Sequence, residues 1–167
     1  MRILKVSPIT VANFAPFGWL ASADGVGGAQ TRPINEGSSL RLDGVGELSL
    51  SARGGQPCLA LFRAQARDLN RPCTVLERHR LGTQTFVPLG GVRYLMLVAT
   101  GTDAPDDASL AAFLVGGHQA VTLRVDTWHH GLMALDAGDF MVVERMGNEV
   151  DCELATLSAA VYLRLEN

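Results

Sequence analysis

The stretch CTVLERHRLGTQTFVPLGGVRYLMLVA, residues 73–99, decides the fold of this chain. It contains three short apolar runs rich in Val, Leu and aromatic residues, separated by Gly, Pro and polar residues. Runs of about five to eight residues with this composition are typical of strands in a β-sandwich or β-barrel. The stretch therefore predicts consecutive β-strands.

Similar runs occur on both sides of this stretch. They read CLALFRAQA, AVTLRV, GLMAL and FMVVERM, and several of them alternate polar with apolar residues. Strands and long helices do not alternate along the chain, which argues against a parallel sheet. The sequence predicts a mainly β fold, an antiparallel barrel or sandwich with a few short helices.

Two segments have the features of short helices instead. Residues 7–20 carry Thr10 as a plausible N-cap, and Pro16 and Gly18 close the segment. Residues 106–117, DDASLAAFLVGG, have an acidic first turn, apolar residues three to four apart and a Gly–Gly stop. We expect a loop over residues 21–33, while the tail, residues 155–166, fits either a strand or a helix.

Composition limits the class of protein. The chain has 167 residues, 47% hydrophobic and 19% charged, so we expect one globular domain over residues 1–167. A net charge of −3 with scattered basic residues gives no electrostatic basis for binding nucleic acid or an anionic membrane. No apolar run approaches the roughly 18–20 residues that span a bilayer, and no signal peptide is recognisable. We therefore expect a cytoplasmic protein.

The three cysteines, Cys58, Cys73 and Cys152, are an odd number without CxxC spacing. A disulfide framework needs an even, dense set, and a structural zinc site needs closely spaced pairs. We expect three free thiols in a reducing compartment.

A carboxylate, an imidazole and a carboxamide lie close together at Glu77, His79 and Gln84. Alternate side chains of a strand share a face, so Glu77 and His79 point to one side and Arg78 to the other. Small β-barrels bind ligands among such inward-facing residues, and burying an idle Glu–His pair is costly. The alternative is a Glu–His pair at a strand end, half in water.

Other candidates are spread along the chain. In DTWHHGLMAL, residues 126–135, the neighbouring His129 and His130 face opposite ways, so at most one enters the same cavity. Arg63 and Arg41 could bind a carboxylate through their guanidinium groups, although surface arginines are common. His118 is expected in a loop.

The chain resembles the ureidoglycolate lyase family, enzymes of allantoin breakdown. The resemblance rests on LERHRLGTQTFVPL, DTWHHGLMALD, LFRAQAR and PINEGSSLRL, which occur in the order and spacing of the family, and it extends to VANFAPFG near the start. It implies a cupin-like β-barrel that assembles as a homodimer and cleaves ureidoglycolate to glyoxylate and urea. The small-molecule substrate would be handled without nucleic acid or membrane.

The resemblance also implies roles for single residues. The positions that bind metal in cupins match Glu77, His79, Gln84 and His129, which could hold a divalent Ni, Zn or Mn ion, weakly because Gln is a poor ligand. Glu77, His79 and His129 would be catalytic. The substrate would be bound by the remaining candidates, Gln84, Arg63, Arg41, Asn35, His130 and Arg80.

Four differences from the family pattern affect the substrate assignment. The family commonly has Pro where Arg80 and Gly131 stand here, Asn where Glu36 stands, and a GVNY-like stretch at residues 120–123. These changes leave two alternatives open. One is a lyase or hydrolase for another small hydroxy or ureido acid, and the other is a non-catalytic barrel that binds a small carboxylate.

Overall fold

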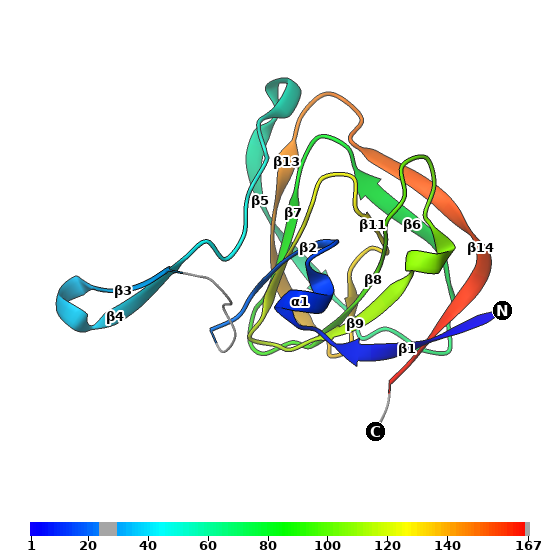
Figure 1. Ribbon diagram of the computed structural model, residues 1–167, viewed down its shortest axis with the longest axis horizontal. Helices are drawn as coiled ribbons and strands as arrows, with labels where there is room; N and C mark the ends of the chain where they lie inside the picture. Colours follow the sequence, from blue (N-terminus) through cyan, green and yellow to red (C-terminus); the bar gives the residue numbers. More distant parts are fainter. Residues whose placement is uncertain (24–29, 166–167) are drawn as a thin grey trace.

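One sheet of the protein closes on itself (Figure 1). The computed structural model describes residues 1–23 and 30–165. In spatial order the strands of this sheet are β11 (Trp128–His129), β6 (Cys73–His79), β14 (Cys152–Arg164), β1 (Arg2–Pro8), β9 (Ala111–Val115), β8 (Tyr94–Ala99) and β12 (Met133–Ala134). Because β11 pairs with both β6 and β8, six of these strands form a closed ring, and β12 extends from β8.

A second sheet packs against one side of the ring. Its order is β2 (Gly18–Ala21), β10 (Ala120–Leu123), β7 (Gln84–Pro88), β13 (Gly138–Met146) and β5 (Gln56–Ala64). All its pairings are antiparallel, whereas β1 pairs in parallel with β14 and β9 in the ring. The prediction of a mainly β, cupin-like barrel or sandwich is confirmed, with these two parallel pairings added.

Strand β8 shows how the apolar residues divide between two cores. Tyr94, Met96 and Val98 belong to the core between the two sheets, whereas Leu95 and Leu97 belong to the core inside the ring. Both sets of side chains are buried, as strand alternation requires for a strand between two apolar layers. The uninterrupted apolar run in the sequence therefore reflects burial on both faces.

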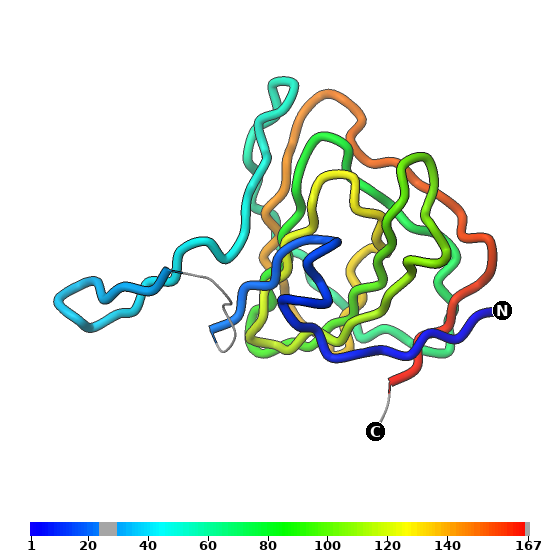
Figure 2. Tube along the Cα trace, viewed as in Figure 1, coloured from blue at the N-terminus to red at the C-terminus, as the bar shows by residue number. Residues whose placement is uncertain are grey.

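A third, two-stranded sheet projects from the body of the protein (Figures 1 and 2). It consists of β3 (Gln30–Ile34), the 3₁₀ turn η1 (Asn35–Gly37) and β4 (Ser39–Asp43), and we call it the arm. A second 3₁₀ turn, η2 (Ala52–Gly54), precedes β5. The loop expected over residues 21–33 is therefore wrong for residues 30–33, which are a strand, and its residues 24–29 lie outside the described residues.

The short N-terminal helix is confirmed, but the second predicted helix is wrong. Helix α1 (Val11–Phe14) has Thr10 as N-cap, and its hydroxyl accepts a hydrogen bond from Asn13 N. Residues 106–117 instead form a 3₁₀ turn, η3 (Asp107–Ser109), followed by strand β9. Between β1 and β8 the apolar residues gain ladder hydrogen bonds and burial on both faces, which outweighs a helical spacing of three to four.

Residues 155–164 of the tail form a strand, because β14 pairs with β6 up to Thr156 and at Val161, and with β1 from Val161 to Arg164. Residue 166 lies outside the described residues. Within residues 1–23 and 30–165, no helix is long and apolar enough to cross a membrane.

Candidate active site

Glu77, His79 and His129 meet between the ring and the second sheet. Glu77 and His79 lie on the same face of β6, and His129 stands directly opposite Glu77 on β11. The ligand atoms of the three side chains lie within 4.8 Å of one another. We call these three residues the Glu–His–His cluster.

One residue of the second sheet, Gln84, contacts His129 directly, and another, Glu144, orients Gln84. Gln84 at the start of β7 places Oε1 3.2 Å from His129 Nε2, and Glu77 Oε1 lies 3.5 Å from the same nitrogen. The Gln84 amide nitrogen donates to Glu144 Oε2 of β13 at 2.8 Å. This bond fixes which end of the Gln84 amide faces the imidazole.

The backbone fixes the tautomer of His129. Its Nδ1 lies 2.9 Å from the carbonyl oxygen of Thr127, which can only accept, so Nδ1 carries the proton of that hydrogen bond. Nε2 then faces two oxygen acceptors. It either holds a second proton and donates to them, or it presents its lone pair to a cation between them. Either arrangement would satisfy both oxygens.

His79 makes fewer hydrogen bonds than His129. Its Nδ1 lies 3.8 Å from Asp151 Oδ2, while its Nε2 is buried and has no hydrogen-bond partner among the described residues. Burial lowers the pKa of His79, and the nearby His129 adds to this effect. The interaction with the His129 imidazole also lowers the pKa of Glu77, against the opposing effect of burial. At neutral pH the site therefore contains an ionised Glu77 and a neutral His79.

The opposite face of β6 holds a separate charge cluster. Arg78 is almost fully buried, lies 4.3 Å from the centre of the Trp128 ring and donates to Glu153 at 2.8 and 2.9 Å. Arg80 also donates to Glu153, at 3.1 Å, and pairs with Asp126. Arg80 thus binds carboxylates of its own chain on the side of β6 away from the Glu–His–His cluster.

The remaining predicted binding residues lie apart from the cluster in the single chain. His130 turns its Nδ1 to the carbonyl oxygen of Gly131, and burial lowers its pKa. Arg63 is largely exposed and pairs with Asp139, on the face of β13 opposite to the buried Phe140. Arg41 and Asn35 belong to the arm.

Two residues that were not predicted flank Glu77. The thiol of Cys152 lies 3.7 Å from Glu77 Oε2, and burial followed by the Glu77 carboxylate raises the pKa of that thiol. Gly131 lies on the other side, where an added Cβ would stand 3.5 Å from Glu77 Oε1. The glycine keeps space open beside the carboxylate.

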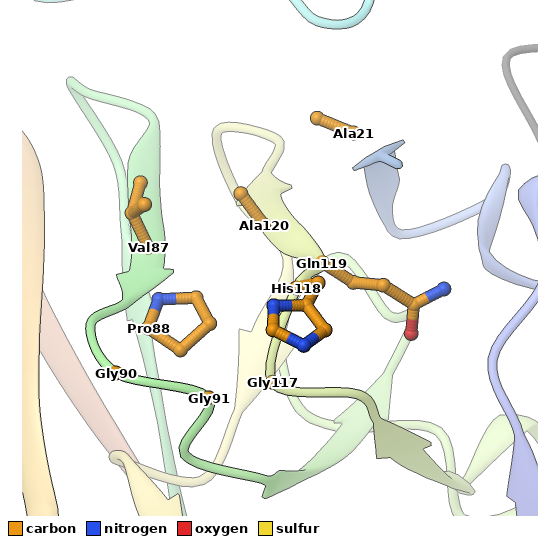
Figure 3. A pocket seen from close by; sticks show the side chains of 9 residues that line it. All are labelled: Ala21, Val87, Pro88, Gly90, Gly91, Gly117, His118, Gln119 and Ala120. Carbon is orange, nitrogen blue, oxygen red and sulfur yellow. The ribbon is translucent and has the colours of Figure 1, made fainter. Parts of the chain in front are cut away.

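A cavity of about 390 Å³ lies at the far ends of β7 and β10 (Figure 3). Its lining is glycine, alanine, valine and proline apart from His118 and Gln119, and the Gln119 carboxamide already accepts from Gly116 N. Gln84 stands at the opposite end of β7, so this cavity does not include the Glu–His–His cluster.

The donor set of the cluster fits a metal ion. It offers two imidazole nitrogens and a carboxylate, one imidazole nitrogen is buried without a partner, and the other is oriented by a backbone carbonyl. Outer hydrogen bonds of this kind orient histidine ligands in metal sites. Glu77, His79 and His129 could therefore hold a metal.

Comparison with known proteins gives the family. The family model described as ureidoglycolate lyase matches residues 1–164. The chain belongs to the ureidoglycolate lyase family. A ureidoglycolate lyase of Burkholderia cepacia is 39% identical over 166 residues, covering 98% of this chain and 92% of the relative. One of Burkholderia mallei (strain NCTC 10229) is 38% identical, covering 98% and 94%, and one of Azotobacter vinelandii is 37% identical, covering 92% and 91%.

The differences from the ureidoglycolate lyase pattern fall in different surroundings. Arg80 lies on the far face of β6, whereas Gly131 borders Glu77 directly. In β10, Thr122 is buried and its hydroxyl pairs with that of Thr85 at 2.9 Å. Of these three positions, only Gly131 is next to the cluster.

Glu144 is the main site residue that sequence reasoning missed. It lies 60 positions from Gln84 in the chain, in the run FMVVERM. Strand alternation gives the available signal, since Phe140, Val142 and Glu144 share a face and a carboxylate on an otherwise apolar face is unusual.

Proposed function

We infer that the chain is a ureidoglycolate lyase, which cleaves ureidoglycolate to glyoxylate and urea. Membership of the family over nearly the whole chain supports this inference. The observation that carries it is the Glu–His–His cluster, in which ionisable groups in different protonation states lie within 4.8 Å. A protein that only binds a small carboxylate has no need of such a set.

The reaction needs a base and an acid. The substrate carries a hydroxyl, a carboxylate and a ureido nitrogen on one carbon. As the hydroxyl proton leaves, the carbonyl of glyoxylate forms, the C–N bond breaks, and its electron pair takes a proton on the departing urea nitrogen. Neutral His79, with a buried and unpartnered Nε2, suits the base, while His129 Nε2 can donate the proton. Ionised Glu77, with Oε1 3.5 Å from His129 Nε2, would favour a positive charge that forms at that nitrogen.

A divalent metal, where one is bound, would be held by Glu77, His79 and His129, and the two imidazole nitrogens would then bind the ion instead of acting as base and acid. Imidazole with carboxylate suits Ni, Zn or Mn, and we propose one of these ions. When bound, the ion would supply Lewis acidity, lowering the pKa of the substrate hydroxyl. Gln84 and Glu144 would then orient His129 and the substrate from the second sheet.

Urea release from ureidoglycolate by the purified protein tests the function. We expect release well above the spontaneous rate, and separate Glu77→Gln and His79→Asn variants should lose it. Unchanged urea release in both variants would refute the roles assigned here. Metal analysis of unwashed protein, followed by chelation and re-addition of each ion, tests the metal. A wild-type protein that binds ureidoglycolate without releasing urea would instead be a carboxylate-binding barrel.

We also propose that the protein works in the cytoplasm on a small molecule and without nucleic acid. Three free cysteines support a reducing compartment. Fractionation of cells that produce the protein tests this location.

A further inference from the structure

The arm stands apart from the two other sheets. In the part of the chain that the structure describes, β3 and β4 pair only with each other, from Gln30 opposite Asp43 to Ile34 opposite Ser39. Most arm side chains are exposed, and Figure 1 shows the arm extending away from both other sheets. A two-stranded ribbon alone is at best marginally stable in water, so an arm of this kind gains stability only from another surface.

The two faces of the arm have different chemistry. Pro33, Leu40 and Leu42 share one face with Thr31, and Leu40 is 61% exposed. Arg32 and Arg41 stand directly opposite each other on the other face, where they share the single carboxylate of Asp43 at 3.5 and 2.7 Å. Two like charges opposite each other destabilise a hairpin. The apolar face therefore fits a protein surface, and the surplus guanidinium fits an anion.

The tip of the arm is held in an unusual conformation. Asn35, Glu36 and Gly37 have φ angles of 50°, 57° and 88°, all in the left-handed region. Consecutive residues of this kind, two of them not glycine, cost free energy and cluster where a backbone shape is used.

The Glu–His–His cluster, in contrast, lacks a basic side chain for the carboxylate of the proposed substrate. Its surroundings contribute further carboxylates, Glu144 and Asp151. Among the arginines of the described residues, none has a side chain that forms an ion pair or hydrogen bond with these acidic groups. Arg78 pairs on the other face of β6, and Arg145 donates to the carbonyl oxygen of Ala52.

An apolar surface is available on the second sheet of another copy. Leu59 and Leu61 of the edge strand β5 are 71% and 60% exposed, and Met141 of β13 lies directly opposite Leu61. Exposed apolar residues on an edge strand indicate a contact surface. A symmetric dimer would cover this surface in both copies at once.

We propose that two copies of the chain exchange their arms, and that Arg41, with Arg32 beside it, binds the substrate carboxylate at the cluster of the other copy. The strands of the arm, at roughly 3.3 Å per residue, are about 16 Å long and so can cross a subunit boundary. This inference rests on the proposed function. In this arrangement, one complete active site consists of the Glu–His–His cluster of one chain and the arm arginines of the other.

Three sets of variants test the exchange. Arg32→Ala combined with Arg41→Ala removes the charge of the arm, and we expect kcat/KM to fall by about tenfold to a hundredfold, mainly through KM. Arg93→Ala is the matched control, since the Arg93 side chain is 57% exposed, as is that of Arg32, and also pairs with an aspartate, Asp136. It should change kcat/KM by less than about twofold. Arg41→Lys, together with Arg32→Ala, should recover part of the loss.

Mixing variants distinguishes exchange from a role within one chain. The arm variant and a His129→Ala variant are denatured together and refolded, so that mixed dimers form. Each mixed dimer would contain one complete site, so activity should return to about a quarter of that of wild type, as random pairing in a two-fold dimer gives. Light scattering of wild type should give twice the monomer mass.

Three results would overturn the inference: a fully active monomer, an arm variant with unchanged kcat/KM, or an impaired arm variant that the His129→Ala variant does not complement. Failure of the proposed function looks different. In that case wild type releases no urea, whether or not it is a dimer.

Discussion

The two faces of strand β6 carry charged side chains from the same seven residues but use them differently. On one face Arg78 is buried and fully paired, with Glu153, a carbonyl oxygen and the Trp128 ring as partners. On the other, His79 keeps a buried nitrogen without a partner, and Glu77 meets His129 at 3.5 Å. Saturated contacts stabilise a fold, whereas groups left partly unsatisfied remain available to a substrate or an ion.

The largest effect on activity should come from the face of β6 that carries Glu77 and His79. Glu77→Gln and His79→Asn each remove an ionisable group at nearly constant shape, and kcat/KM for urea release should fall by about a hundredfold to ten-thousandfold. Stability should stay the same or rise slightly, because active-site residues are often not optimal for folding. If the variants lost Tm together with activity, Glu77 and His79 would stabilise the fold as Arg78 does, and the two faces of β6 would not differ in function.

The pH dependence of wild type checks the same residue. Burial lowers the pKa of His79, and a base must be deprotonated to act. Activity should therefore persist below pH 6.5 and fall only as His79 becomes protonated at lower pH. A fall that begins above the ordinary histidine pKa would contradict His79 as the base.

The next largest effect should come from the face of β6 that carries Arg78, which we call the saturated face, and it should be an effect on stability. Arg78→Met keeps much of the apolar stem but removes the hydrogen bonds to Glu153 and to the carbonyl oxygen of Thr102. Because Glu153 is 43% exposed, the loss reflects mainly the buried guanidinium and its carbonyl partner, and urea denaturation should show a destabilisation of about 1–2 kcal/mol. The folded Arg78→Met variant should retain most of the wild-type kcat/KM. A loss of activity without a loss of stability would show that Arg78 also contributes to catalysis.

A third change tests the second sheet. Glu144→Gln gives Gln84 an uncharged partner that can also donate, so the orientation of the Gln84 amide is no longer fixed. Loss of such an orienting contact should reduce kcat/KM by about tenfold, with little change in Tm. Glu149→Gln, at an exposed carboxylate paired with Arg53, is the control and should have no effect.

The comparison also shows how far sequence reasoning reaches. Period-two alternation predicts which side chains share a face, and it separated Glu77 and His79 from Arg78 correctly. It also predicts that only one of His129 and His130 enters the site. The inference for β6 succeeds because it depends on neighbours within one strand, whereas the one for His129 and His130 stays a prediction.

Inferences that depend on distant contacts were less successful. Residues 111–115 have a spacing that suits a helix, and only the pairing with β1 and β8 makes them a strand. Glu144 enters the site through Gln84, 60 positions away, and local alternation shows only that its carboxylate lies on an apolar face, not which residue it meets. The residue type of Arg41 predicts a carboxylate partner. It does not predict where that partner lies, because the direction of the arm decides the position of Arg41.

The smallest effect should come from Arg80, although it is the direct neighbour of His79 in sequence. Its partners, Asp126 and Glu153, lie on the saturated face, and its side chain is half exposed. Exposed ion pairs contribute little to stability, so Arg80→Ala should shift Tm by less than about 2 °C.

The same variant should leave KM for ureidoglycolate unchanged within about twofold, since the guanidinium lies outside the Glu–His–His cluster. Gly131→Ala is the informative partner experiment, because its Cβ would stand 3.5 Å from Glu77 Oε1 and take up space beside it. A larger change in KM from Gly131→Ala than from Arg80→Ala would show that distance to Glu77, and not proximity in sequence to His79, determines which of the two residues affects substrate binding. The reverse order would mean that the two faces of β6 are coupled through its backbone.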